Sequence, residues 1–492
     1  YKDNKKNHLN AFTTEKDKIA VYSKKIVFIE PSVALEEIYG GLAKVGAVSP
    51  PLNLLLLAAI VREKGYEPYI IDSPALGLNY AGIVNRIEKI KPKFIGITAM
   101  TPHIMQAGKL AKAIKAAVPE AIILLGGAHI SSVPEETMLR FPDIDIGFIG
   151  EADYSLPELL DTVSKGNAAS TVKGTISREH SQLINTGQRG EKIKLDDLPL
   201  YAWDILEGFP HIYKTPLFAA HRTPATPILT SRGCPGKCIF CYSGCHKTIS
   251  TYSAEYIIDM LKHLKERYDI REFMLFDDNF VMFRENLKKL LNMLIEKKLD
   301  LTWSCNARVD MVNQEMLNLM AKAGCWQISY GIETGNQRIM DLLGKNITKE
   351  KVCRAIDMAR SAGIRTVGFF MIGHFGETQE TIDETIEFAR NCGLDDFRMT
   401  FFTPLPGTKA SLMADEYGAF EDEWEGMNLF SPVFIPRCLT KEQLIENQKR
   451  AMRKFFFRPR PVLSYLKMVK NPIIALRGAY MLGQYVLKGN NH

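Results

Sequence analysis

The sequence predicts an α/β protein with two successive parallel sheets and a helical end. Short apolar runs alternate with amphipathic helical patterns over residues 24–165, and the same alternation returns over residues 227–408. Strands that alternate with helices are joined by crossovers and therefore run parallel. In residues 166–226 the helical periodicity fades into scattered glycines with short β-like pieces, which predicts a linker with a small hairpin. A chain of 492 residues is also longer than one hydrophobic core usually serves, which agrees with this division.

The first region contains five apolar runs with the length of strands. They are residues 26–29, 69–71, 94–97, 122–125 and 146–149. Helical patterns separate them, so we expect a doubly wound, Rossmann-like sheet. Such sheets bind ligands at the carboxyl ends of their strands, and the loops there should line a site. These loops have neither a GxGxxG motif nor a P-loop lysine, which argues against a nucleotide ligand.

The second region predicts six strands that close into a partial (β/α)6 barrel. They are residues 228–230, 273–276, 301–305, 327–330, 366–372 and 397–402. Crossovers of one hand place all their carboxyl ends at one mouth. Polar residues follow the strands there, namely Asp277, Asp278, Asn306, Arg308 and Glu333. Carboxylates bind ammonium and hydroxyl groups, while arginine pairs with carboxylate, so the mouth suits a ligand that has all three groups.

Composition is that of a soluble globular enzyme, with 46% hydrophobic and 24% charged residues and a modest net charge of +6. The nine cysteines do not form a disulfide framework, so we expect a reducing cytoplasm. Residues 1–23 are polar and lack the apolar core of a signal peptide; we expect a disordered or artificial lead-in. No run reaches the roughly 18 apolar residues of a membrane span.

The most specific motif is the C-x3-C-x2-C spacing of Cys234, Cys238 and Cys241, directly after the first barrel strand. Three thiolates can ligate three irons of a four-iron cluster and leave the fourth iron open for chemistry. A structural zinc site is the alternative, and it would need a fourth ligand, which Cys245 could supply.

This loop, including Phe240 before the third cysteine, resembles the cluster loop of the radical S-adenosylmethionine (SAM) superfamily. The resemblance implies a [4Fe-4S] cluster on the three cysteines, SAM on its fourth iron, and cleavage of SAM to a 5'-deoxyadenosyl radical. It makes Cys234, Cys238 and Cys241 both metal ligands and catalytic residues. It also implies roles at the barrel mouth, with Asp277 and Asp278 near the methionyl amine or the substrate, Arg308 at the methionyl carboxylate, and Asn306 and Glu333 near the ribose.

The strand ends of the first region resemble the cobalamin-binding domain that precedes many radical SAM domains. The residues concerned are Ser49, Pro50, Thr98, Thr101, Gly126, Gly127, His129, Gly150 and Glu151. The paired glycines would let the backbone approach a flat ligand, and His129 is expected at the nucleotide tail. Cobalamin domains of the methionine synthase type place a histidine after the first strand. Residues 30–49 contain none, so we expect cobalt without a protein histidine beneath it.

Over residues 24–460 the resemblance implies a cobalamin-dependent radical SAM enzyme of class B. Methylation of an unactivated carbon in a small-molecule, lipid or natural-product substrate is the expected reaction. Relatives resembling the anaerobic tetrapyrrole cyclase use the same cofactors for ring formation, and the sequence does not separate the two. A third hypothesis is a protein that only relays electrons. The predicted SAM-binding groups argue against it, because a relay needs no SAM pocket. No flavin or second cluster motif is visible, so a flavodoxin or ferredoxin is the expected reductant.

Residues 409–492 predict a helical, basic segment with interleaved aromatic residues at 453–460. Such a segment can cap the barrel, lie on an anionic membrane or bind nucleic acid. We expect a cap, because radical chemistry requires that water be excluded. Peripheral membrane contact is the alternative, which would place the cytoplasmic protein at a membrane surface. No RNA-binding module accompanies the segment, so no nucleic-acid partner is expected.

Overall fold

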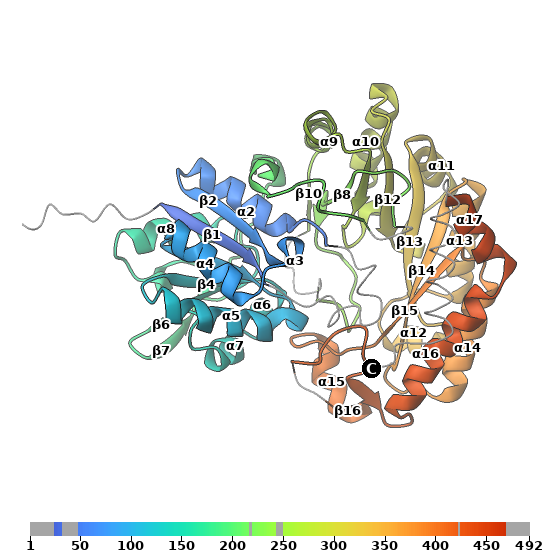
Figure 1. Cartoon of the computed structure of the whole chain (residues 1–492). Helices are drawn as coiled ribbons and strands as arrows, with labels where there is room; N and C mark the ends of the chain where they lie inside the picture. Colours follow the sequence, from blue (N-terminus) through green and yellow to red (C-terminus); the bar gives the residue numbers. More distant parts are fainter. Residues whose placement is uncertain (1–23, 32–47, 216–218, 243–248, 422–423, 469–492) are drawn as a thin grey trace, which may run out of the picture.

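The computed structural model of the protein describes residues 24–31, 48–215, 219–242, 249–421 and 424–468 (Figure 1). Two sheets lie side by side, the N-terminal sheet on the left of the view and the barrel on the right, and part of the C-terminal segment lies below them. This arrangement confirms the predicted α/β fold class. The expected lead-in at residues 1–23 and most of the loop at residues 30–49 lie outside the described residues.

The N-terminal sheet has seven strands in the order β2-β1-β3-β4-β5-β6-β7. Its parallel strands are β1 (Lys25–Glu30), β2 (Glu67–Asp72), β3 (Phe94–Thr98), β4 (Ile122–Gly126) and β5 (Ile146–Phe148). The strand order reverses at β1, which has β2 on one side and β3 on the other. In doubly wound sheets the ligand crevice opens at this switch point, beyond the carboxyl ends of the strands.

Helices cover both faces of this sheet because successive side chains of a strand point to opposite faces. Ile26 and Phe28 of β1 pack with α2 (Leu52–Glu63) and α8 (Ser155–Ser164). On the other face, Val27 and Ile29 pack with α4 and α5. The remaining helices and their bounds are α3 (Ser73–Leu76), α4 (Tyr80–Ile90), α5 (Ile104–Ala117), α6 (Ala128–Ser132) and α7 (Pro134–Arg140).

The hairpin predicted in residues 166–226 is β6 (Thr175–Glu179) and β7 (Gln182–Asn185). It pairs antiparallel with β5 and so extends the N-terminal sheet. A strap, residues 195–203, then passes between the two halves. Ala202 N donates to Leu55 O of α2 at 3.2 Å, and Ser253 N donates to Asp196 at 2.8 Å. The strap therefore fixes the N-terminal sheet against the barrel.

The barrel is an open sheet of six parallel strands in the order β15-β14-β13-β12-β11-β8. They are β8 (Ala225–Ile228), β11 (Glu272–Leu275), β12 (Thr302–Ala307), β13 (Cys325–Glu333), β14 (Arg365–Ile372) and β15 (Asp396–Phe401). The intervening helices are α9 (Ala254–Tyr268), α10 (Arg284–Lys297), α11 (Gln314–Lys322), α12 (Gln337–Leu342), α13 (Lys349–Ser361) and α14 (Gln379–Asn391). Two short strands, β9 (Ser231–Arg232) and β10 (Ser250–Thr251), pair on either side of the cysteine loop.

Local sequence explains where the barrel helices begin. All but α10 start after a side chain whose oxygen accepts a backbone N–H of the first turn, which satisfies a donor that the helix itself leaves unpaired. Ser253 caps α9, Asn313 caps α11, Thr348 caps α13, and Thr378 forms a reciprocal capping box at α14. These caps fix the strand-to-helix turns, and so they fix the mouth of the barrel.

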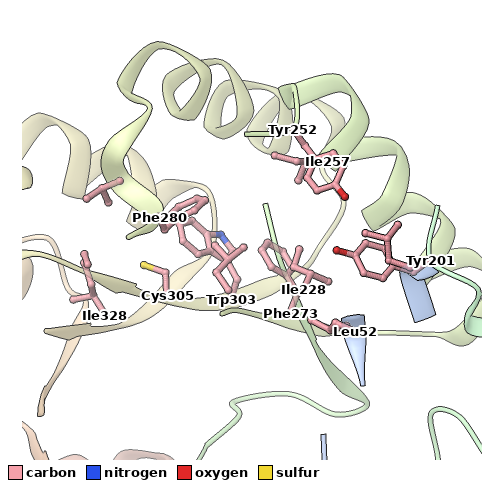
Figure 2. Close-up of a cluster of buried hydrophobic side chains, with 14 of the residues drawn as sticks. Leu52, Tyr201, Ile228, Tyr252, Ile257, Phe273, Phe280, Trp303, Cys305 and Ile328 are labelled. Atoms are coloured by element: carbon pink, nitrogen blue, oxygen red, sulfur yellow. The ribbon is translucent and has the colours of Figure 1, made fainter. Parts of the chain in front are cut away.

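One hydrophobic cluster joins the two halves of the molecule. Figure 2 shows Leu52 of α2 and Tyr201 of the strap beside the barrel residues Ile228 and Tyr252. Deeper in the barrel, Trp303 stacks on Phe273 with ring centroids 5.9 Å apart. Burial of apolar surface in a shared core makes the relative placement of two sheets a property of the fold rather than of a flexible tether.

The C-terminal segment contains α15 (Lys409–Tyr417), α16 (Lys441–Phe456) and α17 (Pro459–Met468). It also has an element the sequence analysis did not anticipate, the antiparallel pair β16 (Gly418–Phe420) and β17 (Phe434–Pro436). α16 packs on α14 and β15, where Phe455 stacks on Phe397 at 4.9 Å. Among the helices of the described residues, none is both long and apolar enough to cross a membrane.

Candidate functional site

The three cysteines of the C-x3-C-x2-C loop follow β9 and are partly exposed. Gly236 N donates to Cys234 Sγ at 3.4 Å, and Cys241 N donates to Cys238 O at 3.2 Å. In the described part of the chain, no three His, Cys, Asp or Glu side chains are grouped to hold one metal ion. A cubic cluster does not need such convergence, because each of its thiolates binds a different iron. The donor set therefore fits a cluster. Cys245 lies outside the described residues.

Asp277 forms hydrogen bonds with the residues that lead into the cysteine loop. Its carboxylate is 1% exposed and accepts hydrogen bonds from Thr230 N at 2.9 Å and Ser231 Oγ at 2.6 Å. Burial raises its pKa to about 6, although these hydrogen bonds favour the charged form. The carboxylate thus anchors the start of the cysteine loop to the end of β11. Its contact with the methionyl amine stays a prediction, and its exposed neighbour Asp278 lies at the same strand end.

Backbone contacts hold the other side of the loop. Ile239 N donates to Leu343 O at 3.1 Å, and Ala410 N donates to Ile239 O at 2.8 Å. The ring of Phe240 meets Phe402 edge-on at 6.4 Å. Gly344 has a φ of +69°, and a Cβ there would lie 3.1 Å from Lys237 O, so glycine is required for this approach. The loop is therefore fixed between the end of α12 and the start of α15.

Arg308 lies beside the cysteines at the end of β12. Its side chain is 13% exposed, and its Nε and one terminal nitrogen donate to Asp310 at 3.0 Å each. The guanidinium also donates to Lys345 O at 2.7 Å, and its other nitrogen lies 3.9 Å from Cys238 Sγ. The structure thus brings Arg308 to the cysteine loop. Asp310 occupies the two guanidinium N–H donors that a carboxylate ligand would also use. Asn306 precedes it on β12 and is partly buried.

Glu333 and Lys345 form a buried ion pair, with side chains 10% and 8% exposed. Glu333 has a φ of +72°, at a point where the register between β13 and β14 shifts. Burial raises the pKa of the Cys238 thiol, and the charges of Lys345 and Arg308 oppose that rise. Sequence reasoning missed Lys345, because a lysine after a short helix resembles any solvated lysine. The place of Glu333 at the ribose stays a prediction.

The loop after β14 contributes two buried polar residues that were not among the predicted site residues. His374 Nε2 lies 3.3 Å from Glu333 O, and Glu377 accepts a hydrogen bond from His374 N at 3.0 Å. Burial lowers the pKa of His374 to about 4 and raises that of Glu377 to about 7. Within the described residues, His374 Nδ1 and one oxygen of Glu377 have no hydrogen-bond partner. Buried polar atoms of this kind are commonly satisfied by an ordered water or a ligand.

At the carboxyl edge of the N-terminal sheet, His129 is fully buried, and its Nδ1 lies 3.1 Å from Thr101 Oγ1. Thr98 Oγ1 accepts a hydrogen bond from Asn53 at 2.9 Å. Gly126 has open space where a Cβ would be. Gly127 has a φ of +109°, and a Cβ there would lie 2.4 Å from Ala99 O. The loops after β3 and β4 therefore pack closely at Gly127 and leave open space at Gly126, and we call the surface that they form the cradle.

The two carboxyl edges meet through Arg232, which directly precedes the cysteine loop. Its guanidinium donates to Asp153 at 2.7 Å and to Glu151 at 3.0 Å, and its side chain is 17% exposed. Gly150 N, next to Glu151, donates to Ser131 Oγ at 2.9 Å. Glu151 and Gly150 thus join the cradle to the cysteine loop. Ser49 and Pro50 lie before α2, one exposed and one buried.

A second group of titratable residues at this edge was not predicted. Burial, together with the nearby charge of Asp72, raises the pKa of Glu30 to about 8, and burial lowers that of His103. His103 Nδ1 lies 3.8 Å from Glu30, and Tyr213 of the linker donates to Asp72 at 2.9 Å. These groups end β1 and β2 and begin the helix after β3. Their shifted pKa values could not be predicted from the sequence of any one strand, because they depend on neighbours from other elements.

Comparison with known proteins agrees with both halves of this site. Residues 228–389 match the radical SAM superfamily, and residues 39–160 match the B12 binding domain. The chain is 30% identical to an uncharacterized methyltransferase, PH0819, of Pyrococcus horikoshii, over 85% of this chain and 90% of the relative. It is 26% identical to the anaerobic magnesium-protoporphyrin IX monomethyl ester cyclase of Rubrivivax gelatinosus, over 88% and 77%. Its fold matches the radical SAM methyltransferase TsrM from Kitasatospora setae with a TM-score of 0.68 and 15% identity, over 92% and 90%.

Proposed function

Because the chain belongs to the cobalamin-binding radical SAM enzymes, we propose that it methylates an unactivated carbon of a small-molecule, lipid or natural-product substrate. The [4Fe-4S] cluster, SAM and cobalamin supply the radical and the methyl group when they are bound. The observation that supports this most is the bridge from Arg232 to Glu151 and Asp153. It holds the cysteine loop against the cobalamin edge, so that a substrate between them would contact both.

In this proposal the barrel residues bind and orient SAM. Cys234, Cys238 and Cys241 hold the cluster, and Asp277 keeps their loop in place through its hydrogen bonds to Thr230 and Ser231. The cations of Arg308 and Lys345 lie on one side of the cysteines, where they favour a bound carboxylate. Asp278 would meet the amine, while Asn306 and Glu333 would meet the ribose.

The cobalamin edge would place the second cofactor without a cobalt ligand from the protein. Thr98, Thr101, Gly126, Gly127, Gly150, Glu151, Ser49 and Pro50 are the proposed cobalamin-binding residues, with His129 at the nucleotide tail. His129 Nδ1 already pairs with Thr101. Held by these residues without a histidine on cobalt, cobalamin would supply a methyl group suited to transfer to a carbon radical. Electron paramagnetic resonance of the Co(II) form, free of nitrogen splitting, would check this.

The test is an anaerobic reaction of reduced, fully loaded protein with SAM carrying a deuterated methyl group and a cell extract. Methylation predicts equal amounts of S-adenosylhomocysteine and 5'-deoxyadenosine, together with a product that has gained the labelled methyl. The matched control is Cys238→Ala, which should yield neither SAM product. A wild-type protein that cleaves no SAM would overturn the proposal and favour electron relay.

Oxidative ring formation is the second candidate, and the likeness to the magnesium-protoporphyrin cyclase favours it. It predicts a different balance in the same experiment, because no methyl group leaves SAM. Deoxyadenosine would form without S-adenosylhomocysteine, and the product would have lost hydrogen. The two reactions are therefore separated by one measurement of SAM products.

We further propose that a flavodoxin or ferredoxin delivers the electrons and that the C-terminal segment contacts anionic membranes from the cytoplasm. Phe457 and Leu463 are 71% and 56% exposed and lie among arginines of the same segment, including Arg458 and Arg460. Exposed apolar side chains close in sequence to basic ones suit the interface of an anionic bilayer. Sedimentation with anionic vesicles tests this, and no binding at low salt would argue against it.

A further inference from the structure

The loop between β16 and β17 reaches from the C-terminal segment to the cobalamin edge. Its Trp424 meets His129 edge-on, with ring centroids 4.4 Å apart and an interplanar angle of 79°. The guanidinium of Arg140, at the end of α7, lies 4.9 Å from the centre of the same indole. Next to it, Glu425 forms an exposed ion pair with Lys109 at 3.8 Å. Trp424 thus lies between α6 and α7, although it belongs to the other end of the chain.

A second contact fixes the same helix. Gly407, in the loop after β15, packs so closely on α6 that a Cβ there would lie 2.6 Å from Ser132 Cβ. α6 follows the paired glycines and carries His129 in its first turn. Two separate stretches of the C-terminal half therefore pack on the short helix that bears the predicted cobalamin residue.

The imidazole of His129 lacks one hydrogen-bond partner in this contact with Trp424. It is fully buried, and within the described residues its Nε2 has no hydrogen-bond partner. Burial lowers its pKa to about 4, so the ring is neutral at physiological pH. A buried polar atom without a partner destabilises the empty protein, and a ligand that supplies the partner is correspondingly favoured. Trp424 lies against this ring, so a ligand that reaches Nε2 would contact the indole.

We propose that Trp424 forms a wall of the site for the nucleotide tail of cobalamin, so that the C-terminal segment completes the cofactor site of the first sheet. This inference rests on the proposed function. The tail is narrow and carries an aromatic base, a ribose and a phosphate, whereas the corrin ring is too broad for a fully enclosed position. Its polar groups would satisfy His129, and its base offers a face or an edge to the indole.

The test compares two probes, hydroxocobalamin and cobinamide, which retains the corrin ring but lacks the nucleotide tail. Dissociation constants are measured by equilibrium dialysis on the full chain. Stacking of a base on an aromatic side chain is worth about 1–3 kcal/mol, so Trp424→Ala should weaken hydroxocobalamin binding about 10-fold. Cobinamide binding should change less than about 2-fold by the same reasoning, since the ring contacts stay intact. Trp424→Phe should keep most of the affinity for hydroxocobalamin.

Glu425→Ala is the matched control, because it removes an exposed ion pair of the same loop and leaves the indole in place. Exposed pairs are worth about 0–1 kcal/mol, so both probes should bind nearly as before. Equal weakening of both probes by Trp424→Ala, or an equal loss in Glu425→Ala, would mean that the loop only holds the two halves together and would overturn the inference. Unchanged hydroxocobalamin binding in Trp424→Ala would overturn it too. Wild-type protein that binds neither probe would overturn the cobalamin function itself.

Discussion

The strands of both sheets end at a carboxyl edge that lines the site, but the two edges bury different kinds of group. At the barrel mouth two ion pairs lie close to the cysteines, Arg308 with Asp310 and Lys345 with Glu333. A negatively charged iron–sulfur loop and a zwitterionic ligand both gain from such fixed charges, which need no reorganisation when the ligand arrives. The barrel edge is therefore arranged for ions.

At the N-terminal edge, away from the ion pairs of Arg232, several buried titratable groups are neutral instead. Burial lowers the pKa of His129 to about 4 and lowers that of His103 as well, while the pKa of Glu30 rises to about 8. At neutral pH both imidazoles are uncharged, and Glu30 is mostly protonated. A broad ligand that binds through many weak contacts suits such an edge, since no desolvated charge has to be matched. The ion pairs beside the cysteines and the neutral groups that end β1 and begin α5 and α6 thus suit different kinds of ligand.

Removal of a cluster ligand should have the largest effect on the barrel edge. We expect Cys238→Ala to lose the iron–sulfur cluster after anaerobic reconstitution, because only two thiolates of the loop would remain. Iron and sulfide content and the visible absorption band measure this. Cys245→Ala is the control and should retain the cluster. Loss of the cluster in that control would revive the four-cysteine reading.

Removing one partner of the buried ion pair between Glu333 and Lys345 tests whether each charge is needed to stabilise the other. Lys345→Met leaves Glu333 charged and buried, and removal of one partner of such a pair destabilises a protein by about 3–5 kcal/mol. Urea unfolding followed by circular dichroism measures the loss. The double variant Glu333→Gln/Lys345→Met has no uncompensated charge and should recover most of the stability. A double variant as unstable as the single one would show that the two residues act through packing instead.

The neutral edge can be tested by pH. Because the pKa of Glu30 rises from its usual 4.5 to about 8 on folding, the folded protein binds this proton more tightly than the unfolded chain does. Stability is therefore lost as pH rises from 4.5 to about 8. Glu30→Gln removes that penalty and should be more stable than wild type by roughly 3–5 kcal/mol at pH 8.5. The two proteins should converge near pH 4.5, and a difference independent of pH would contradict the assignment.

Patterns in the sequence were sufficient for the strands and for the cysteine loop, because both depend on neighbours a few residues away. β1 to β5 lie where the apolar runs predicted them, and the β6–β7 hairpin lies within the predicted linker. Side-chain partners were a different matter. Asp277 was predicted at the mouth from its position, but its carboxylate pairs with Thr230, 47 residues away. The contact of Trp424 with His129 joins opposite ends of the chain, and no local pattern specifies it.

The smallest expected effect concerns Arg308, whose guanidinium is already paired with Asp310. We expect Arg308→Ala to weaken SAM binding by about 1.5–3 kcal/mol, the range for hydrogen bonds to a charged group, without loss of the cluster. Isothermal titration of the reconstituted protein measures the affinity, and iron content provides the check on the cluster. Asp310→Asn is the matched variant. It keeps the shape of the fork but removes the competing negative charge, so SAM should bind equally well or more tightly. Unchanged SAM affinity in Arg308→Ala would mean that the guanidinium only holds Asp310 and Lys345 O, and that Lys345 is the better candidate for the methionyl carboxylate.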